Sequence, residues 1–198
     1  MAGFFLPGRR TTVIMRGMTT DESLFPALLG PAWAGLAAPV RRAHGGRSSI
    51  ALRGQADVVG TDSRAARLLR QLLGVPAPGP AQPLIVEIAR DDDGEQWTRR
   101  FALGRMRSRL SAGPDGLLHE RLGPVLLRFR LEADGGEIHW HLLGARLLGL
   151  PLPRRWLGHV LACSGAEGDR YAFTVEASLP GIGRWIGYRG TLEVDDGA

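Results

Sequence analysis

The sequence contains no lysine, only one cysteine and no long run of apolar residues. The single cysteine, Cys163, excludes an internal disulfide and any metal site built from several cysteines, and it favours a reducing, cytoplasmic compartment. No stretch approaches the roughly 20 apolar residues that a membrane-spanning helix requires. We therefore predict a cytoplasmic protein without a membrane span.

Motifs that identify common enzyme classes are also missing. The sequence has no phosphate-binding loop, no nucleophile elbow and no zincin motif. Gly181, Gly183 and Gly187 imitate a dinucleotide-binding fingerprint, but they lead from a proline turn into a strand, whereas the fingerprint leads from a strand into a helix. We predict no bound cofactor, no catalytic residues and no catalytic activity of the chain's own.

The 25 basic residues are all arginines, and with 20 acidic residues the formal net charge is +5. A basic chain suggests nucleic-acid binding. The arginines are nevertheless spread along the sequence between apolar residues, which argues against a nucleic-acid partner. Arg105, Arg107 and Arg109 share one face of a predicted strand. We interpret this stripe as a solvated face, and an anionic partner surface is the alternative.

The length of 198 residues and the apolar share of 44% fit one globular domain. We predict a loosely ordered lead over residues 1–20 and a single β-rich domain over residues 21–198. Helical spacing of apolar residues, broken by prolines, predicts short capping helices near residues 23–44. A second helix is predicted over residues 62–73, with Asp62 as its N-cap and Gly74 as its end.

From Leu84 onward apolar residues recur with a period of two, which is typical of strands. The predicted strands are residues 49–59, 84–90, 96–110, 117–122, 125–131, 137–143, 158–163, 171–178 and 185–194. Short turns and no helices separate the later ones. The pattern predicts a mainly β fold with N-terminal helices (α+β). We expect an antiparallel meander of eight or nine strands, closed or partly closed as a barrel that can hold one small ligand.

Two charged residues fall on strand faces that are otherwise apolar. Arg99 shares its face with Trp97 and Phe101, and Glu120 lies between Leu118 and Leu122 on the face of a later strand. Because an isolated buried charge is very unfavourable, we expect Arg99 and Glu120 to pair. The pair is either a structural salt bridge or the polar floor of a ligand cavity.

Tyr188 is a third candidate for a polar group inside the barrel, since it is in phase with Ile186 and Leu192. We therefore predict ligand-binding residues at Trp97, Arg99, Phe101, Glu120 and Tyr188.

Glu137, His139 and His141 also share one strand face, and H-x-H on a strand is a spacing found among metal ligands. A third protein ligand is not recognisable, so we interpret these histidines as solvated and predict no metal site. An enzyme that uses His139 with His141, or His119 with Glu120, is kept as the least favoured alternative.

Several short motifs, taken in order, resemble those of the family known as domain of unknown function 4166. They are Leu28-Leu29-Gly30 with Val40 to His44, Leu52-Arg53-Gly54, Trp97-x-Arg99-x-Phe101 with Met106-x-Ser108, Glu120-x-x-Gly123, Leu147 to Pro153, and Tyr188-x-Gly190. The resemblance implies a domain found alone or fused behind a dinucleotide-binding domain of the saccharopine-dehydrogenase-like or short-chain-reductase kind. It implies no activity.

Together these observations favour a non-catalytic β-barrel that binds a small apolar or amphipathic molecule. In this hypothesis the apolar segment from Leu147 to Leu152 also lines the cavity. The alternative is an interaction or accessory domain that serves a separate NAD(P)-dependent oxidoreductase, which the fusions implied by the resemblance suggest.

Overall fold

The structure is a computed structural model that describes residues 23–46, 49–102 and 104–195. The predicted lead over residues 1–20 lies outside this range. Three short helices precede the first strand: α1 (Leu24–Leu29), the 3₁₀ helix η1 (Gly30–Gly35) and α2 (Ala38–His44). They confirm the helices predicted near residues 23–44. Within the described residues, no helix has the length and apolar composition needed to cross a membrane.

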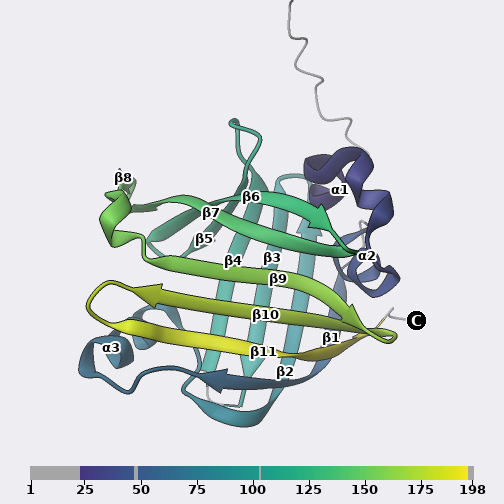
Figure 1. Ribbon diagram of the computed structural model, residues 1–198. Helices are drawn as coiled ribbons and strands as arrows, with labels where there is room; N and C mark the ends of the chain where they lie inside the picture. Colours follow the sequence, from purple (N-terminus) through teal and green to yellow (C-terminus); the bar gives the residue numbers. More distant parts are fainter. Residues whose placement is uncertain (1–22, 47–48, 103, 196–198) are drawn as a thin grey trace, which may run out of the picture.

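Eleven strands follow in an antiparallel meander, interrupted by α3 (Arg64–Leu73) and the 3₁₀ turn η2 (Arg154–Trp156) (Figure 1). They are β1 (Ile50–Val59), β2 (Gly79–Asp91), β3 (Gly94–Phe101), β4 (Gly104–Ala112), β5 (Leu118–Leu122), β6 (Val125–Asp134), β7 (Glu137–Leu147), β8 (Leu150–Pro151), β9 (His159–Glu167), β10 (Arg170–Leu179) and β11 (Gly183–Asp195).

Pairing of the first strand with the last, and of β6 with β7, closes the barrel. Strand β1 pairs with β11 over Ala51 to Val59, and β6 pairs with β7 over its whole length. The ring therefore contains ten strands, and the two-residue β8 is attached outside it to β7. This confirms the predicted mainly β fold and its barrel.

The strand count differs from the prediction at residues 96–110, which form two strands instead of one. The chain turns between Phe101 and Gly104, which are partners in the β3–β4 register. Trp97, Arg99 and Phe101 point inward before the turn, and Met106, Ser108 and Leu110 point inward after it. The outward arginine stripe of β4 confirms the predicted faces, with Arg105 and Arg107 exposed.

Helix α3 begins one residue later than the predicted cap implies. Ser63 is the N-cap, and its Oγ accepts a hydrogen bond from the Ala66 N–H. Asp62 instead forms ion pairs with Arg67 and Arg70. The buried Arg70 guanidinium donates to the carbonyls of Thr61, at 2.8 Å, and Trp185, at 3.1 Å, which holds the helix on the barrel. Gly74, at φ +67°, ends the helix as predicted.

Candidate ligand-binding site

The barrel encloses a cavity of about 440 Å³, and its wall is almost entirely apolar. Alternate side chains of the strands form most of the wall, since every second residue of a strand points inward. Helix α2 adds Ala43 and His44, and α3 adds Leu69 and Leu73. The volume lies within the roughly 300–1,000 Å³ that is usual for small-molecule pockets.

Three cavity-lining side chains are also exposed to solvent, and they mark where the cavity reaches the surface. Leu72 of α3 is 64% exposed, Trp156 of η2 is 57% exposed and Leu147 of β7 is 39% exposed. Helix α3 and strand β8 lie on the same side of the barrel, and α1 and α2 lie on the opposite side (Figure 1). We call Leu72, Leu147 and Trp156 the mouth residues.

A buried ion pair lies on the cavity wall, as the strand faces predicted. The Arg99 guanidinium donates to Glu120 Oε1 at 3.5 Å and to Ser108 Oγ at 2.9 Å. It also lies over the Trp97 ring, 4.7 Å from the ring centroid. Arg99 and Glu120 are each 8% exposed. The pair therefore places a fixed positive and a fixed negative charge on an otherwise apolar surface.

A second polar cluster joins α2 to strands β9 and β10. The Tyr171 hydroxyl donates to Ser164 Oγ at 2.9 Å, and His44 Nε2 lies 3.1 Å from the same hydroxyl. Nε2 of the imidazole is therefore occupied by a hydrogen bond with this hydroxyl. Within the described part of the chain, Nδ1 is buried and has no hydrogen-bond partner.

The charge of His44 follows from its surroundings. Burial, together with the positive charges of Arg90 and Arg99, lowers the pKa of His44 from 6.5 to about 3. The imidazole is therefore neutral near pH 7. Burial also raises the pKa of Tyr188, so its phenol keeps its proton. The Arg99–Glu120 charges oppose one another, so these cavity groups together carry no net charge.

Four of the five predicted ligand-binding residues line the cavity. They are Trp97, Arg99, Glu120 and Tyr188. Phe101 is buried but lies behind this surface, where its ring packs edge-on against Tyr188 at 5.7 Å between centroids. Leu147 and Leu152 of the predicted apolar segment line the cavity as well.

Sequence reasoning missed His44, Ser164 and Tyr171. Tyr171 is in phase with Phe173 and Val175 on β10, so the period of two could have placed it inside. Ser164 lay one residue beyond the predicted end of its strand. No local pattern marks His44, because its burial depends on the docking of α2 against β9, β10 and β11.

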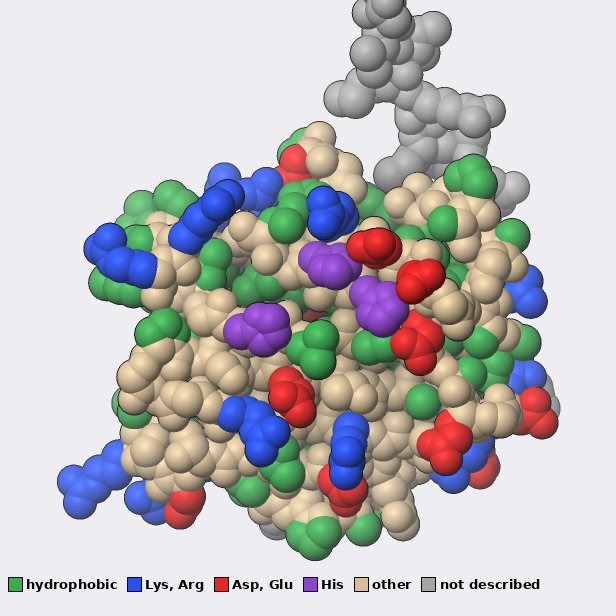
Figure 2. Space-filling view, viewed as in Figure 1, with side chains coloured by type: hydrophobic (Ala, Val, Ile, Leu, Met, Phe, Trp, Pro, Cys, Tyr) green, Lys and Arg blue, Asp and Glu red, His purple; other side chains and the backbone are tan. Residues whose placement is uncertain are grey.

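The histidines considered for catalysis, His119, His139 and His141, do not line the cavity. His119 points outward and pairs with Asp115 at 3.1 Å, whereas Glu120 points into the barrel. His139 and His141 lie on the outer face of β7, where histidine and acidic side chains gather (Figure 2). Burial, with an added contribution from Glu137, raises the pKa of the Cys163 thiol to about 12, so a free thiolate nucleophile is not populated.

The model of a domain of unknown function, DUF4166, matches residues 36–192, which is most of the chain. The chain belongs to the DUF4166 family. No match was found among curated proteins or among solved structures.

The barrel brings together two of the motifs on which the resemblance to the family rested. Leu52-Arg53-Gly54 lies on β1 and Tyr188-x-Gly190 lies on β11, and the two strands pair along their length. A Cβ atom on Gly54 would lie 2.1 Å from the Thr191 carbonyl oxygen, and one on Gly190 would lie 2.0 Å from that of Gln55. Both glycines therefore permit the close backbone approach that closes the barrel.

Proposed function

We propose that this DUF4166 domain is a non-catalytic barrel that binds a small molecule, largely apolar with one uncharged polar group. The observation that carries the proposal is the apolar cavity of about 440 Å³, which has a few polar groups on its wall and an apolar mouth. Sites of this kind bind ligands by burying apolar surface and use the polar groups to orient them.

The few polar groups on the cavity wall favour an uncharged ligand group over an ionised one. Arg99 is already paired with Glu120, and His44 is neutral at pH 7. A carboxylate placed beside Arg99 would compete with Glu120 and repel it. A hydroxyl group can instead accept a hydrogen bond from Arg99 or donate one to Glu120 without adding a charge, because both residues line the cavity. A long-chain alcohol is an example of this chemistry.

The proposal is tested by titrating the full chain with N-phenyl-1-naphthylamine, an uncharged apolar fluorophore. We expect saturable binding with enhanced, blue-shifted emission, and displacement by dodecanol at lower concentration than by dodecanoate. Ala162→Phe should weaken binding by at least about tenfold, because Ala162 is buried and lines the cavity. Ala172→Phe, on the outward face of β10, is the matched control.

Two results would contradict the proposal. One is the absence of saturable binding by the folded protein. The other is equal binding by the wild type and a folded Ala162→Phe variant, because the probe would then bind outside the barrel. Circular dichroism of both variants shows whether the barrel has formed.

A second candidate function is supported by the apolar corner that follows β7. Leu148 is 79% exposed and Leu150 is 73% exposed, and neither lines the cavity. Exposed apolar groups of this kind fit an interaction with another protein, such as a separate NAD(P)-dependent oxidoreductase. The double variant Leu148→Ser, Leu150→Ser should no longer co-elute with an oxidoreductase encoded beside this gene. Unchanged co-elution would show that this corner does not bind the oxidoreductase.

A further inference from the structure

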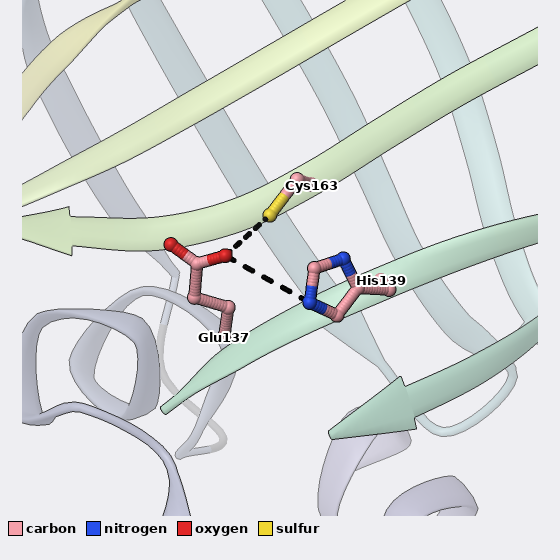
Figure 3. A group of neighbouring side chains, drawn as sticks. All are labelled: Glu137, His139 and Cys163. Carbon is pink, nitrogen blue, oxygen red and sulfur yellow. Dashed lines mark hydrogen bonds and ion pairs between the residues drawn. The ribbon is translucent and has the colours of Figure 1, made fainter. Parts of the chain in front are cut away.

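Three side chains with different metal-binding atoms meet on the outer face of strands β7 and β9. His139 of β7 is the register partner of Cys163 of β9, and Glu137 lies two residues before His139 on the same face. The three side chains converge from the two strands (Figure 3). One ligand atom from each lies within 4.8 Å of those of the other two.

The spacing of these atoms is close to that of a tetrahedral site. Cys163 Sγ lies 3.1 Å from Glu137 Oε2, and His139 Nε2 lies 3.8 Å from the same oxygen. With metal bonds of about 2.3 Å to sulfur and about 2.0 Å to nitrogen or oxygen, tetrahedral angles separate the ligand atoms by roughly 3.3–3.6 Å. Small side-chain rotations therefore bring all three atoms onto one ion.

We propose that Glu137, His139 and Cys163 bind a divalent transition-metal cation of the zinc type. The mixture of a thiolate, an imidazole and a carboxylate suits Zn²⁺, whereas Mg²⁺ and Ca²⁺ prefer oxygen ligands alone. Binding replaces the thiol proton: the Cys163 S–H bond breaks, a sulfur–metal bond forms, and one proton passes to solvent. Three protein ligands leave a fourth position for water.

The surroundings of the three residues favour a cation at this place. Gly165 is next along the same face of β9, and a Cβ atom there would lie 2.6 Å from Glu137 Oε1. The glycine therefore makes room for the carboxylate. Glu132 of β6 is the register partner of His139 and pairs with His141 Nε2 at 2.9 Å, which adds negative charge nearby. His139 and Glu137 are 35% and 45% exposed, so an ion can reach them.

This site changes the expectation drawn from the sequence, which was that of no metal. The H-x-H pattern drew attention to His139 and His141 but gave no third ligand. The structure brings Cys163 beside His139, whereas His141 faces Leu161 across the same ladder. The ligand set is therefore defined by pairing between strands, which spacing along one strand cannot show.

The test is a titration of the full chain, freed of metal with a chelator, with Co²⁺ as a spectroscopic substitute for Zn²⁺. We expect the near-ultraviolet charge-transfer band of a cobalt–thiolate bond, and its loss when Zn²⁺ displaces Co²⁺. The chain has one cysteine, so this band reports on Cys163 alone. Cys163→Ser should abolish it.

Variants of the neighbouring residues test the assignment of the other ligands. Glu137→Gln and His139→Gln should each weaken Zn²⁺ binding by more than the roughly 10- to 100-fold that loss of a supporting residue costs. His141→Gln, on the same face of β7, is the matched control and should leave the affinity unchanged. Glu137 and His139 do not line the barrel cavity, so their variants test metal binding separately from the proposed ligand binding.

Two outcomes would overturn the proposal. One is the absence of a cobalt–thiolate band in the folded wild-type protein. The other is equal weakening by His141→Gln and His139→Gln, since the histidine pair would then matter instead of the assembled trio. Circular dichroism confirms that each variant folds, as expected for substitutions on the outer face.

Discussion

His44 is enclosed by aromatic rings that leave no room for water around its imidazole. Phe25 lies 4.2 Å and Trp97 lies 5.5 Å from its ring centroid, and Tyr171 contacts it edge-on. Its pKa is lowered to about 3 by burial and by two arginines. Near pH 5, His44 therefore takes up a proton when the protein unfolds, and acid should favour the unfolded state.

Stability should fall as the pH falls from 6.5 toward 3. The unfolded chain takes a proton on His44 below pH 6.5, whereas the folded chain resists it until about pH 3. Because a tenfold difference in proton affinity is worth about 1.4 kcal/mol, and the unfolded histidine is already half protonated at pH 6.5, the loss attributable to His44 is roughly 2 kcal/mol between pH 6.5 and 4.5.

This prediction is measured by urea unfolding of the wild type and His44→Gln at the two pH values. The free energy of unfolding of the wild type should drop by about 2 kcal/mol more than that of the variant. Equal pH dependence of the two proteins would show that His44 is not the group responsible. The comparison removes the contribution of the carboxyl groups, which both proteins share.

Arg99→Met should be strongly destabilising, because it leaves the Glu120 carboxylate buried among apolar groups. The expected cost is about 3–5 kcal/mol, and a further Glu120→Leu substitution should restore most of it. Arg100→Met is the matched control. Its ion pair with Glu87 is about half exposed, so its loss should cost no more than about 1 kcal/mol.

Chemical denaturation of the three variants measures these differences. If Arg99→Met costs no more stability than Arg100→Met, the Arg99–Glu120 pair is not a buried interaction of the kind described.

Strand phase alone identified Arg99, Glu120 and Tyr188, because the period of two is a local property of the chain. It could not identify His44, whose position is set by helix docking.

Strands β3 and β4 show what periodicity can and cannot define at the scale of an element. Residues 96–110 read as one strand because no proline or asparagine marks a turn between Phe101 and Gly104. The inward residues nevertheless change from odd positions, such as Arg99, to even positions, such as Met106. This change of phase is the signal in the sequence that could have located the turn.

The pairing of β1 with β11 depends on glycines that face the opposing backbone. Gly190→Ala should destabilise the barrel by about 1–3 kcal/mol, because the new Cβ atom would lie 2.0 Å from the Gln55 carbonyl oxygen. Gly144→Ala on β7 is the control, since its Cβ atom would meet nothing closer than Arg128 Nη1 at 3.8 Å.

Thermal unfolding of both variants measures this effect. Gly190→Ala should lower the melting temperature by several degrees, whereas Gly144→Ala should leave it nearly unchanged. Equal melting temperatures would mean that β1 and β11 are not as close as described. The same experiment tests why Gly54 and Gly190 occur in the motifs that the DUF4166 resemblance rests on.

At the scale of the whole molecule, the meander and a barrel were predicted, but the sequence left open whether the barrel closes fully. Consecutive strands joined by short turns leave few topologies. Closure requires pairing between the first strand and the last, which are more than 120 residues apart at Ala56 and Gly190. The cavity depends on that closure, so its volume and its mouth between α3 and η2 could not be derived from spacing along the chain.

The central claim is that this barrel holds a small molecule in its cavity. The most direct measurement is native mass spectrometry of the wild-type protein and Ala162→Phe as purified from cells, each with a denatured control. We predict that the wild type carries a bound small molecule that is lost on denaturation, and that the folded variant carries none. A wild-type protein found only at its bare mass, or a variant that retains the same molecule, would contradict the claim.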